Sequence, residues 1–181
     1  MCGPKFLRRF TLGEVGASPH RESKMDEITA WHEAGHAVVA VMLGGVVDTV
    51  SVEVPDAEAA GMTGVFWGSA SDTRSQYIND IHVALAGPIA EMIFVGDYDY
   101  LRIKQEHAVD WEVVAAAIER LGLDEVAAQK LLVSIATGLY QRLRADVVWS
   151  AVADVAERLE LDGTIDGDTV NDLAGFWLRQ I

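Results

Sequence analysis

The stretch His32-Glu33-Ala34-Gly35-His36, followed at 37–43 by the apolar run AVVAVML, is the most informative part of this sequence. Positions four apart share one face of an α-helix, so the two imidazoles can hold one Zn²⁺. Glu33 lies one residue along, where a carboxylate can take a proton from a metal-bound water and return it to a leaving amine. With 5 His in 181 residues, chance gives about 0.01 such matches. We therefore predict metal ligands His32 and His36 and a catalytic base, Glu33.

The alternative is that both imidazoles are only polar residues on a helix. They flank an apolar run, however, and unpartnered buried imidazoles are costly. The spacing of Ile28, Trp31, Val38 and Met42 predicts a helix over 26–43 that ends at Gly44-Gly45.

The rest of the chain predicts one small β unit among helices. Residues 46–54 alternate and are rich in β-branched side chains, and 62–67 form a partner strand. Further helices are expected over 71–95, with Pro88 kinking or dividing it, and over 105–121, 124–144, 145–161 and after Asp168, with an interhelical turn at 162–168. The fold class is therefore α+β and mostly α-helical, with a zincin-like HExxH helix, a small antiparallel β unit and a C-terminal helical bundle.

Zinc needs a third protein ligand, which leaves its fourth position for water. The metzincin pattern requires Gly and His at positions 39 and 42, where this chain has Val39 and Met42, so that class is excluded. The remaining candidates are Glu91, on a predicted later helix, and His82, His107 and Asp110.

Several segments together resemble the peptidase domain of FtsH-type proteases. These are HEAGHA at 32–37, the strand hairpin, AGPIAEMIFVG at 86–96 and the Asp that begins DWEVVAAAIERLG at 110–122. The resemblance covers residues 26–122. It implies one Zn²⁺ per chain, held by His32, His36 and Asp110, with Glu33 as the base.

Two neighbouring residues keep alternative roles. Glu91 is either a zinc ligand in place of Asp110 or a hydrogen-bond partner that orients a ligating histidine. His107, one helical turn before Asp110, is a ligand, a partner of a ligand, or an exposed or structural imidazole. Here the chain departs from the family, because Gln105-Glu106-His107-Ala108-Val109 replaces a small-residue, Asn-Asp approach to the third ligand.

FtsH-type proteases carry an AAA+ ATPase module and usually membrane spans ahead of the peptidase domain. This sequence has no Gly-x-x-x-x-Gly-Lys-Ser/Thr phosphate loop. No nearly uncharged stretch reaches the roughly 20 apolar residues of a membrane span. We therefore expect a protein that is ATP-independent on its own, with no membrane partner, to which a separate ATPase partner could deliver substrate.

The strand at 62–67 suggests how a peptide or protein substrate binds. An edge strand near the metal can pair with an extended substrate backbone. Gly64 would permit close approach of that backbone, and Val65 would face the same side as Trp67. The alternative is a two-stranded unit that only covers the helices.

The composition limits the partners and the cellular compartment that we expect for this protein. The net charge of −14 argues against nucleic acid and anionic lipid surfaces, and the single Cys2 forms no internal disulfide, so we expect a cytoplasmic protein. Residues 1–24 are expected to be a poorly ordered arm, and 25–181 a single domain with the zinc site within 26–122 and a helical remainder at 123–181. Self-association as a homo-oligomer is expected from one apolar helix face, formed by Leu131, Leu132, Ile135 and Leu139.

These observations favour a zinc metallopeptidase that hydrolyses peptide bonds through a Glu33-activated, zinc-bound water. An alternative from another class is a catalytically silent zinc-binding interaction or scaffold protein of the same fold. Intact Glu33 argues against that alternative, since a silent protein has no evident need for the base. A zinc-dependent hydrolase of non-peptide amides would use the same residues and differ only in its pocket.

Overall fold

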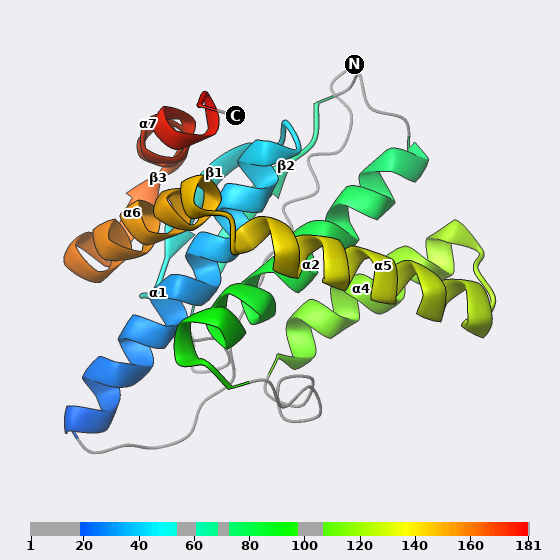
Figure 1. Cartoon of the computed structure of the whole chain (residues 1–181), viewed down its shortest axis with the longest axis horizontal. Helices are drawn as coiled ribbons and strands as arrows, with labels where there is room; N and C mark the ends of the chain where they lie inside the picture. Colours follow the sequence, from blue (N-terminus) through cyan, green and yellow to red (C-terminus); the bar gives the residue numbers. More distant parts are fainter. Residues whose placement is uncertain (1–18, 54–60, 69–72, 98–106, 181) are drawn as a thin grey trace.

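Two long apolar helices form the centre of the fold (Figure 1). The computed structural model describes residues 19–53, 61–68, 73–97 and 107–180. Helix α1 (Pro19–Met42) packs along α2 (Thr73–Val95), while α4 (Ala108–Leu121) and α5 (Glu125–Leu143) pack on α2. Helix α6 (Asp146–Asp162) lies against α1, and α7 (Gly167–Leu178) lies against α6. The predicted α+β, mostly helical class is confirmed.

The closest approach of α1 and α2 occurs at Gly35. A Cβ atom at this position would lie 2.6 Å from the Cβ of Ala90 and 2.8 Å from the carbonyl oxygen of Ala86. Contacts this short do not occur between real side chains, so a larger residue at 35 would push the helices apart. Because Gly35 lies between the two histidines of the motif, this contact sets the motif directly against α2.

Helix α2 is continuous through Pro88 over its 23 residues. By length and composition alone it is apolar enough to cross a membrane, but 61% of its most apolar window is buried inside the protein. Its buried residues include Asp80 and Glu91 as well as the apolar run between them. In this fold α2 is therefore a core helix, packed by α1 on one side and by α4 and α5 on others.

The sheet has three antiparallel strands in the order β2-β1-β3. Strand β1 (Val46–Ser51) pairs with β2 (Met62–Phe66), and a bulge or irregularity lies between Val47 and Val50. Its other edge pairs with β3 (Thr164–Asp166). The interpretation of 162–168 as only an interhelical turn is therefore wrong, because residues 164–166 form a strand. Three residues are too few to show alternation, and β3 is recognisable only from its partner.

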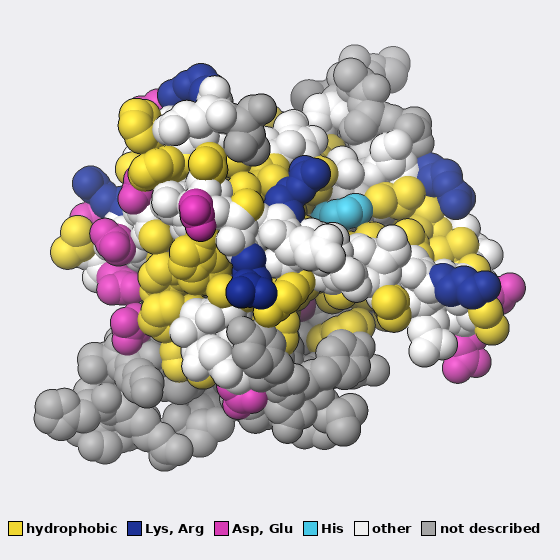
Figure 2. Space-filling view, in the orientation of Figure 1, with side chains coloured by type: hydrophobic (Ala, Val, Ile, Leu, Met, Phe, Trp, Pro, Cys, Tyr) yellow, Lys and Arg dark blue, Asp and Glu magenta, His cyan; other side chains and the backbone are white. Residues whose placement is uncertain are grey.

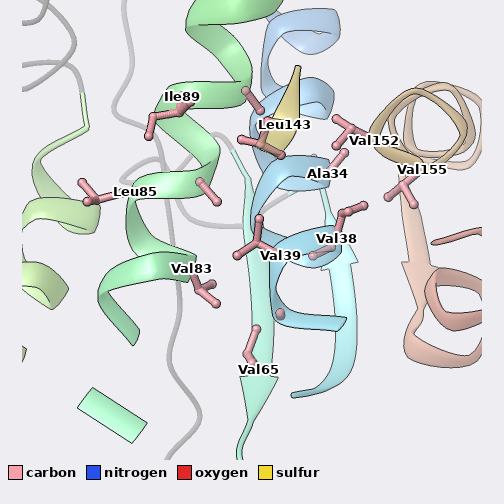
Figure 3. Close-up of a cluster of buried hydrophobic side chains, with 14 of the residues drawn as sticks. Ala34, Val38, Val39, Val65, Val83, Leu85, Ile89, Leu143, Val152 and Val155 are labelled. Carbon is pink, nitrogen blue, oxygen red and sulfur yellow. The ribbon is translucent and has the colours of Figure 1, made fainter. Parts of the chain in front are cut away.

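The apolar core surrounds the motif helix on several sides (Figure 3). Val38 and Ala34 of α1 lie towards Val152 and Val155 of α6, and all four are fully buried. Side chains of α2 and of β2 complete this cluster on the other side of α1: Val83, Leu85, Ile89 and Val65. The motif is thus carried by a helix that has little freedom to shift.

Several boundaries differ from the sequence-based expectation. Helix α1 begins at Pro19, so residues 19–24 are helical rather than a poorly ordered arm, and residues 1–18 lie outside the described part. Helix α4 begins at Ala108 instead of residue 105, which places Asp110 in its first turn. Asp124 caps α5 as expected by accepting a hydrogen bond of 2.8 Å from the backbone N–H of Ala127.

The apolar face expected to drive self-association is largely used within the chain. Ile135 and Leu139 are 6% and 5% exposed and belong to the core, while Leu131 and Leu132 are partly buried against it. Helix α5 packs with this face on its own neighbours. Ile135 and Leu139 therefore give no free surface for a second copy, while Leu131 and Leu132 stay partly exposed.

Candidate metal centre

Three buried side chains from two helices converge on one point. His32 and His36 of α1 are completely buried, and their Nε2 atoms are 2.9 Å apart. Asp110 arrives from the first turn of α4 and is 1% exposed. Its Oδ2 lies 3.2 Å from Nε2 of His32, and its Oδ1 lies 3.4 Å from Nε2 of His36. The structure thus brings together the three ligands that the resemblance implied.

The spacing of these atoms fits a zinc ion. Zn–N and Zn–O bonds of about 2.0–2.1 Å in a tetrahedron set neighbouring ligand atoms roughly 3.3 Å apart. Among the described residues, neither carboxylate oxygen of Asp110 has a hydrogen bond of good geometry. A buried carboxylate without donors is costly unless a cation balances it. The donor set, its spacing and this unsatisfied carboxylate together favour a bound divalent cation.

Gly87 of α2 leaves space beside the ligand atoms. A Cβ atom on Gly87 would lie 2.6 Å from Nε2 of His32 and would contact Nε2 of His36 at least as closely. Any side chain at this position would therefore occupy the region where the ligand atoms converge. Sequence reasoning did not single out Gly87, although it lies in the AGPIAE segment at 86–91 that supported the resemblance.

The other ring nitrogen of each histidine is also held. Nδ1 of His36 donates to the carbonyl oxygen of Val83 at 2.6 Å, and Nδ1 of His32 lies 3.3 Å from Oε2 of Glu91. Such partners orient a ligating imidazole and direct its Nε2 towards the metal. The structure therefore places Glu91 on the Nδ1 side of His32 and Asp110 on the Nε2 side.

Glu91 also lies close to a third imidazole, that of His107. Nε2 of His107 lies 3.1 Å from Oε2 of Glu91, and the ring of His107 lies over that of His32 with 4.6 Å between centroids. Burial alone would raise the pKa of Glu91, but hydrogen bonding to His107 and His32 outweighs it and lowers the pKa to about 2. His107 is completely buried, so its interpretation as an exposed imidazole is wrong.

His82, the remaining histidine candidate, lies elsewhere. It is half-buried on α2, and its Nδ1 donates to the carbonyl oxygen of Ile78 at 2.9 Å. It belongs to neither group of potential metal ligands found among the described residues.

Glu33 lies beside the three-ligand group, and only one of its two carboxylate oxygens has a hydrogen-bond partner among the described residues. Its Oε2 accepts a hydrogen bond of 2.6 Å from the hydroxyl of Thr63 on β2. Its Oε1 has no hydrogen-bond partner among the described residues, and a Cβ atom on Gly61 would lie 2.5 Å from it. Burial raises the pKa of Glu33 to about 7, against the opposing effect of the two nearby imidazoles. A carboxyl group with this pKa can exchange a proton near neutral pH.

This arrangement occurs in a segment with known relatives. Residues 20–115 match the model of Peptidase family M41. This segment includes His32, Glu33, His36 and Asp110. The chain belongs to peptidase family M41. The resemblance to the FtsH-type peptidase domain is thereby confirmed.

Two curated relatives match parts of this chain. A stretch of 93 residues is 36% identical to the "ATP-dependent zinc metalloprotease FtsH" of Veillonella parvula and covers 46% of this chain and 14% of that protein. A stretch of 75 residues is 37% identical to the "ATP-dependent zinc metalloprotease FtsH 2" of Methylacidiphilum infernorum and covers 38% of this chain and 11% of that protein. The match thus spans a small part of each relative's length.

The two residues expected to bind substrate differ in their placement in this M41 fold. Strand β2 lies at one edge of the sheet, as that expectation required. Val65, however, is 4% exposed and packs in the core, so its side chain does not face a substrate. Gly64 is buried, and its backbone belongs to the edge strand. Thr63, which contacts Glu33, is the residue of this strand that sequence reasoning missed.

Zinc affinity of this M41 site should increase with pH. Burial lowers the pKa of His32, but the nearby carboxylates of Asp110 and Glu91 outweigh it and raise the pKa to about 10. His32 is therefore protonated in the metal-free protein at neutral pH, and zinc must displace that proton. We expect the zinc Kd to fall about tenfold for each pH unit between about pH 6 and pH 8.

Competition with a chromophoric chelator of known pH dependence would measure this slope. Calorimetry in two buffers of different ionisation enthalpy would count the released protons independently. A Kd that does not change across this range, with no proton release, would contradict the prediction.

Proposed function

We propose that this chain is a zinc metallopeptidase that hydrolyses peptide bonds. The observation that carries the proposal is the buried Oε1 of Glu33, which has no hydrogen-bond partner among the described residues and lies beside the converging side chains of His32, His36 and Asp110. Zinc bound by these three residues would supply a Lewis acid that polarises the scissile carbonyl and acidifies water. A scaffold protein has no use for a buried carboxylate that is half satisfied and adjacent to such a group.

Glu33 performs the proton transfers. Its Oε1 accepts a proton from the attacking water as the new C–O bond forms, and it donates that proton to the amine nitrogen as the C–N bond breaks. A pKa of about 7 allows both directions at neutral pH. Thr63 holds the other oxygen, so that Oε1 is the atom left to face the reacting groups.

The edge strand supports a peptide or protein substrate. An extended chain can add to the edge of β2 by backbone hydrogen bonds, and Gly64 permits close approach. Thr63 lies on the same strand and contacts Glu33. A peptide bound along β2 would therefore run close to the base.

We further infer that hydrolysis needs no nucleotide, because the residues proposed for the reaction all lie in this chain. The relatives are named ATP-dependent, and a separate ATPase would serve to deliver folded substrates. We also propose that the chain is cytoplasmic and that it assembles into a homo-oligomer. The acidic charge of −14 favours proteins over nucleic acid or anionic membranes as partners.

The test uses the purified chain loaded with about one equivalent of zinc. An unstructured protein such as casein is expected to be cleaved without ATP, with activity lost on chelation and restored by zinc. Zinc binding without cleavage of any peptide would instead support the scaffold alternative. Cleavage of small amides but not of peptides would show a hydrolase of another substrate class.

Replacing Thr63 tests how Glu33 is tuned. The hydrogen bond from Thr63 lowers the pKa of Glu33, so Thr63→Val should raise it. Since the base acts deprotonated, the acidic limb of the kcat/KM profile should move up by about one pH unit, while activity well above that limb changes less. Thr63→Ser keeps the hydroxyl and should retain the wild-type profile. A Val variant with an unshifted limb would show that this hydrogen bond does not tune the base.

A further inference from the structure

The proposed hydrolysis gives no role to His107, a titratable side chain that is completely buried. It occupies the N-cap position of α4, where residues normally satisfy the first backbone N–H groups of the helix. His107 makes no such side-chain hydrogen bond, and its ring is completely buried. Because the N-cap residue does not cap the helix and its polar ring is buried, we expect the ring of His107 to have another role.

The contacts of His107 reach each element of the metal centre. Its Nε2 lies 3.1 Å from Oε2 of Glu91 on α2, and the same oxygen lies 3.3 Å from Nδ1 of His32 on α1. Its ring lies over the ring of His32 at an interplanar angle of 33°. Its carbonyl oxygen accepts a hydrogen bond of 3.2 Å from the backbone N–H of Trp111, directly after Asp110. The imidazole of His107 thus contacts both Glu91 and the proposed ligand His32.

We propose that His107 is a positioning residue of the metal centre, whose imidazole holds Glu91 against His32. The inference rests on the proposed metal site. It assigns His107 no contact with metal or substrate.

The reason is geometric. Glu91 extends from α2 between two imidazoles, and a single oxygen lies within hydrogen-bonding distance of both. Without the imidazole of His107 beside it, Glu91 keeps only its hydrogen bond of 3.3 Å to Nδ1 of His32, so the carboxylate and the His32 ring are held less firmly. Partners of this kind typically change metal affinity about 10–100-fold.

The same atoms could in principle hold a second cation, since His32, Glu91 and His107 also lie within ligand distance of one another. In that case His32 would bind one cation through each ring nitrogen and would keep no proton. The hydrogen bond from Nδ1 to Glu91 needs that proton. The positioning role is therefore the one that the contacts favour.

The experiment measures zinc binding by the metal-free full chain through chelator competition. His107→Phe keeps an aromatic ring over His32 but removes the N–H, and we expect a zinc Kd about 10–100-fold weaker with an altered visible spectrum of the Co²⁺-substituted protein. His107→Gln restores an N–H donor towards Glu91 and should recover most of the affinity and the spectrum. His82→Phe, a histidine of α2 outside the centre, is the matched control and should behave as wild type.

Circular dichroism and thermal unfolding of the metal-free variants separate positioning from folding. Wild-type affinity and Co²⁺ spectrum in His107→Phe would overturn the inference and leave the proposed function intact. Equal losses of affinity and metal-free stability in the Phe and Gln variants would overturn it in favour of a purely structural role. Two zinc ions per wild-type chain, with one lost in His107→Phe, would overturn it in favour of a second metal site. A wild-type chain that binds no zinc would overturn both proposals.

Discussion

Glu33→Gln should reduce peptide hydrolysis by a factor of about 10²–10⁴ or more and leave zinc binding unchanged. The amide has nearly the same size as the carboxylate and can still accept the hydrogen bond that Thr63 donates. It cannot take up a proton at neutral pH, so the water loses its base and the leaving amine loses its acid. The measurements are kcat/KM with a fluorogenic peptide and zinc content by elemental mass spectrometry on the same sample.

A suitable control is Glu27→Gln, because Glu27 lies on the same helix and outside the metal centre. This variant should keep wild-type activity and zinc. If Glu33→Gln retains full activity with zinc bound, another group acts as the base and the mechanism proposed for Glu33 is wrong. If activity and zinc are lost together, the residue supports the site's structure as well, and the kinetic effect alone is not diagnostic of catalysis.

Asp110→Ala should weaken zinc binding by more than about 100-fold, so that the purified variant contains little metal. In the metal-free protein, burial would raise the pKa of Asp110, but the imidazoles of His36 and His32 hold it well below its usual range. Asp110 therefore presents a charged carboxylate to the site at neutral pH. Its removal takes away one of the three ligands and the negative charge that favours a cation.

Glu91→Gln is the informative comparison for this second prediction. It should weaken zinc binding only about 10–100-fold, because Glu91 orients His32 from its Nδ1 side rather than facing the ligand atoms. Zinc per chain after purification without chelator, with circular dichroism of each metal-free variant, would distinguish the two residues. If Glu91→Gln alone strips the metal, the third ligand is Glu91 and the placement of Asp110 has another meaning.

The sequence predicts well those features that depend on local spacing. The four-residue interval between His32 and His36 fixes their common helix face in any context, because helical periodicity is a backbone property. The helix caps at Asp124 and Gly122 follow from equally local chemistry.

The choice between Asp110 and Glu91 depends instead on how two helices cross. Both residues reach the same imidazole, one at Nε2 and one at Nδ1. Spacing along the chain does not determine on which side of a ring a distant residue arrives. The close contact at Gly35 sets how α2, which carries Glu91, meets α1, and the packing of α4 on α2 places Asp110.

Residues that act through shape or through a neighbouring strand gave no signal in the sequence. Thr63 resembles any other β-branched residue of a strand until the fold places it 2.6 Å from Glu33. Gly87 matters because it lacks a side chain. For Val65, alternation predicts which residues share a face of β2, but only packing reveals that this face is the buried one.

The pairing of β1 with β3 has a consequence for how the chain is made. Ser51 and Thr164 meet side by side although 113 positions separate them, so all of the residues between them must be synthesised before β1 acquires its second neighbour. Until then the sheet that carries Thr63 has an open edge at β1, which can pair with another chain. The segment that matches the family ends at residue 115, well short of β3. A fragment trimmed to that segment would therefore expose β1 permanently and be prone to aggregate, even though it contains every proposed ligand and the base.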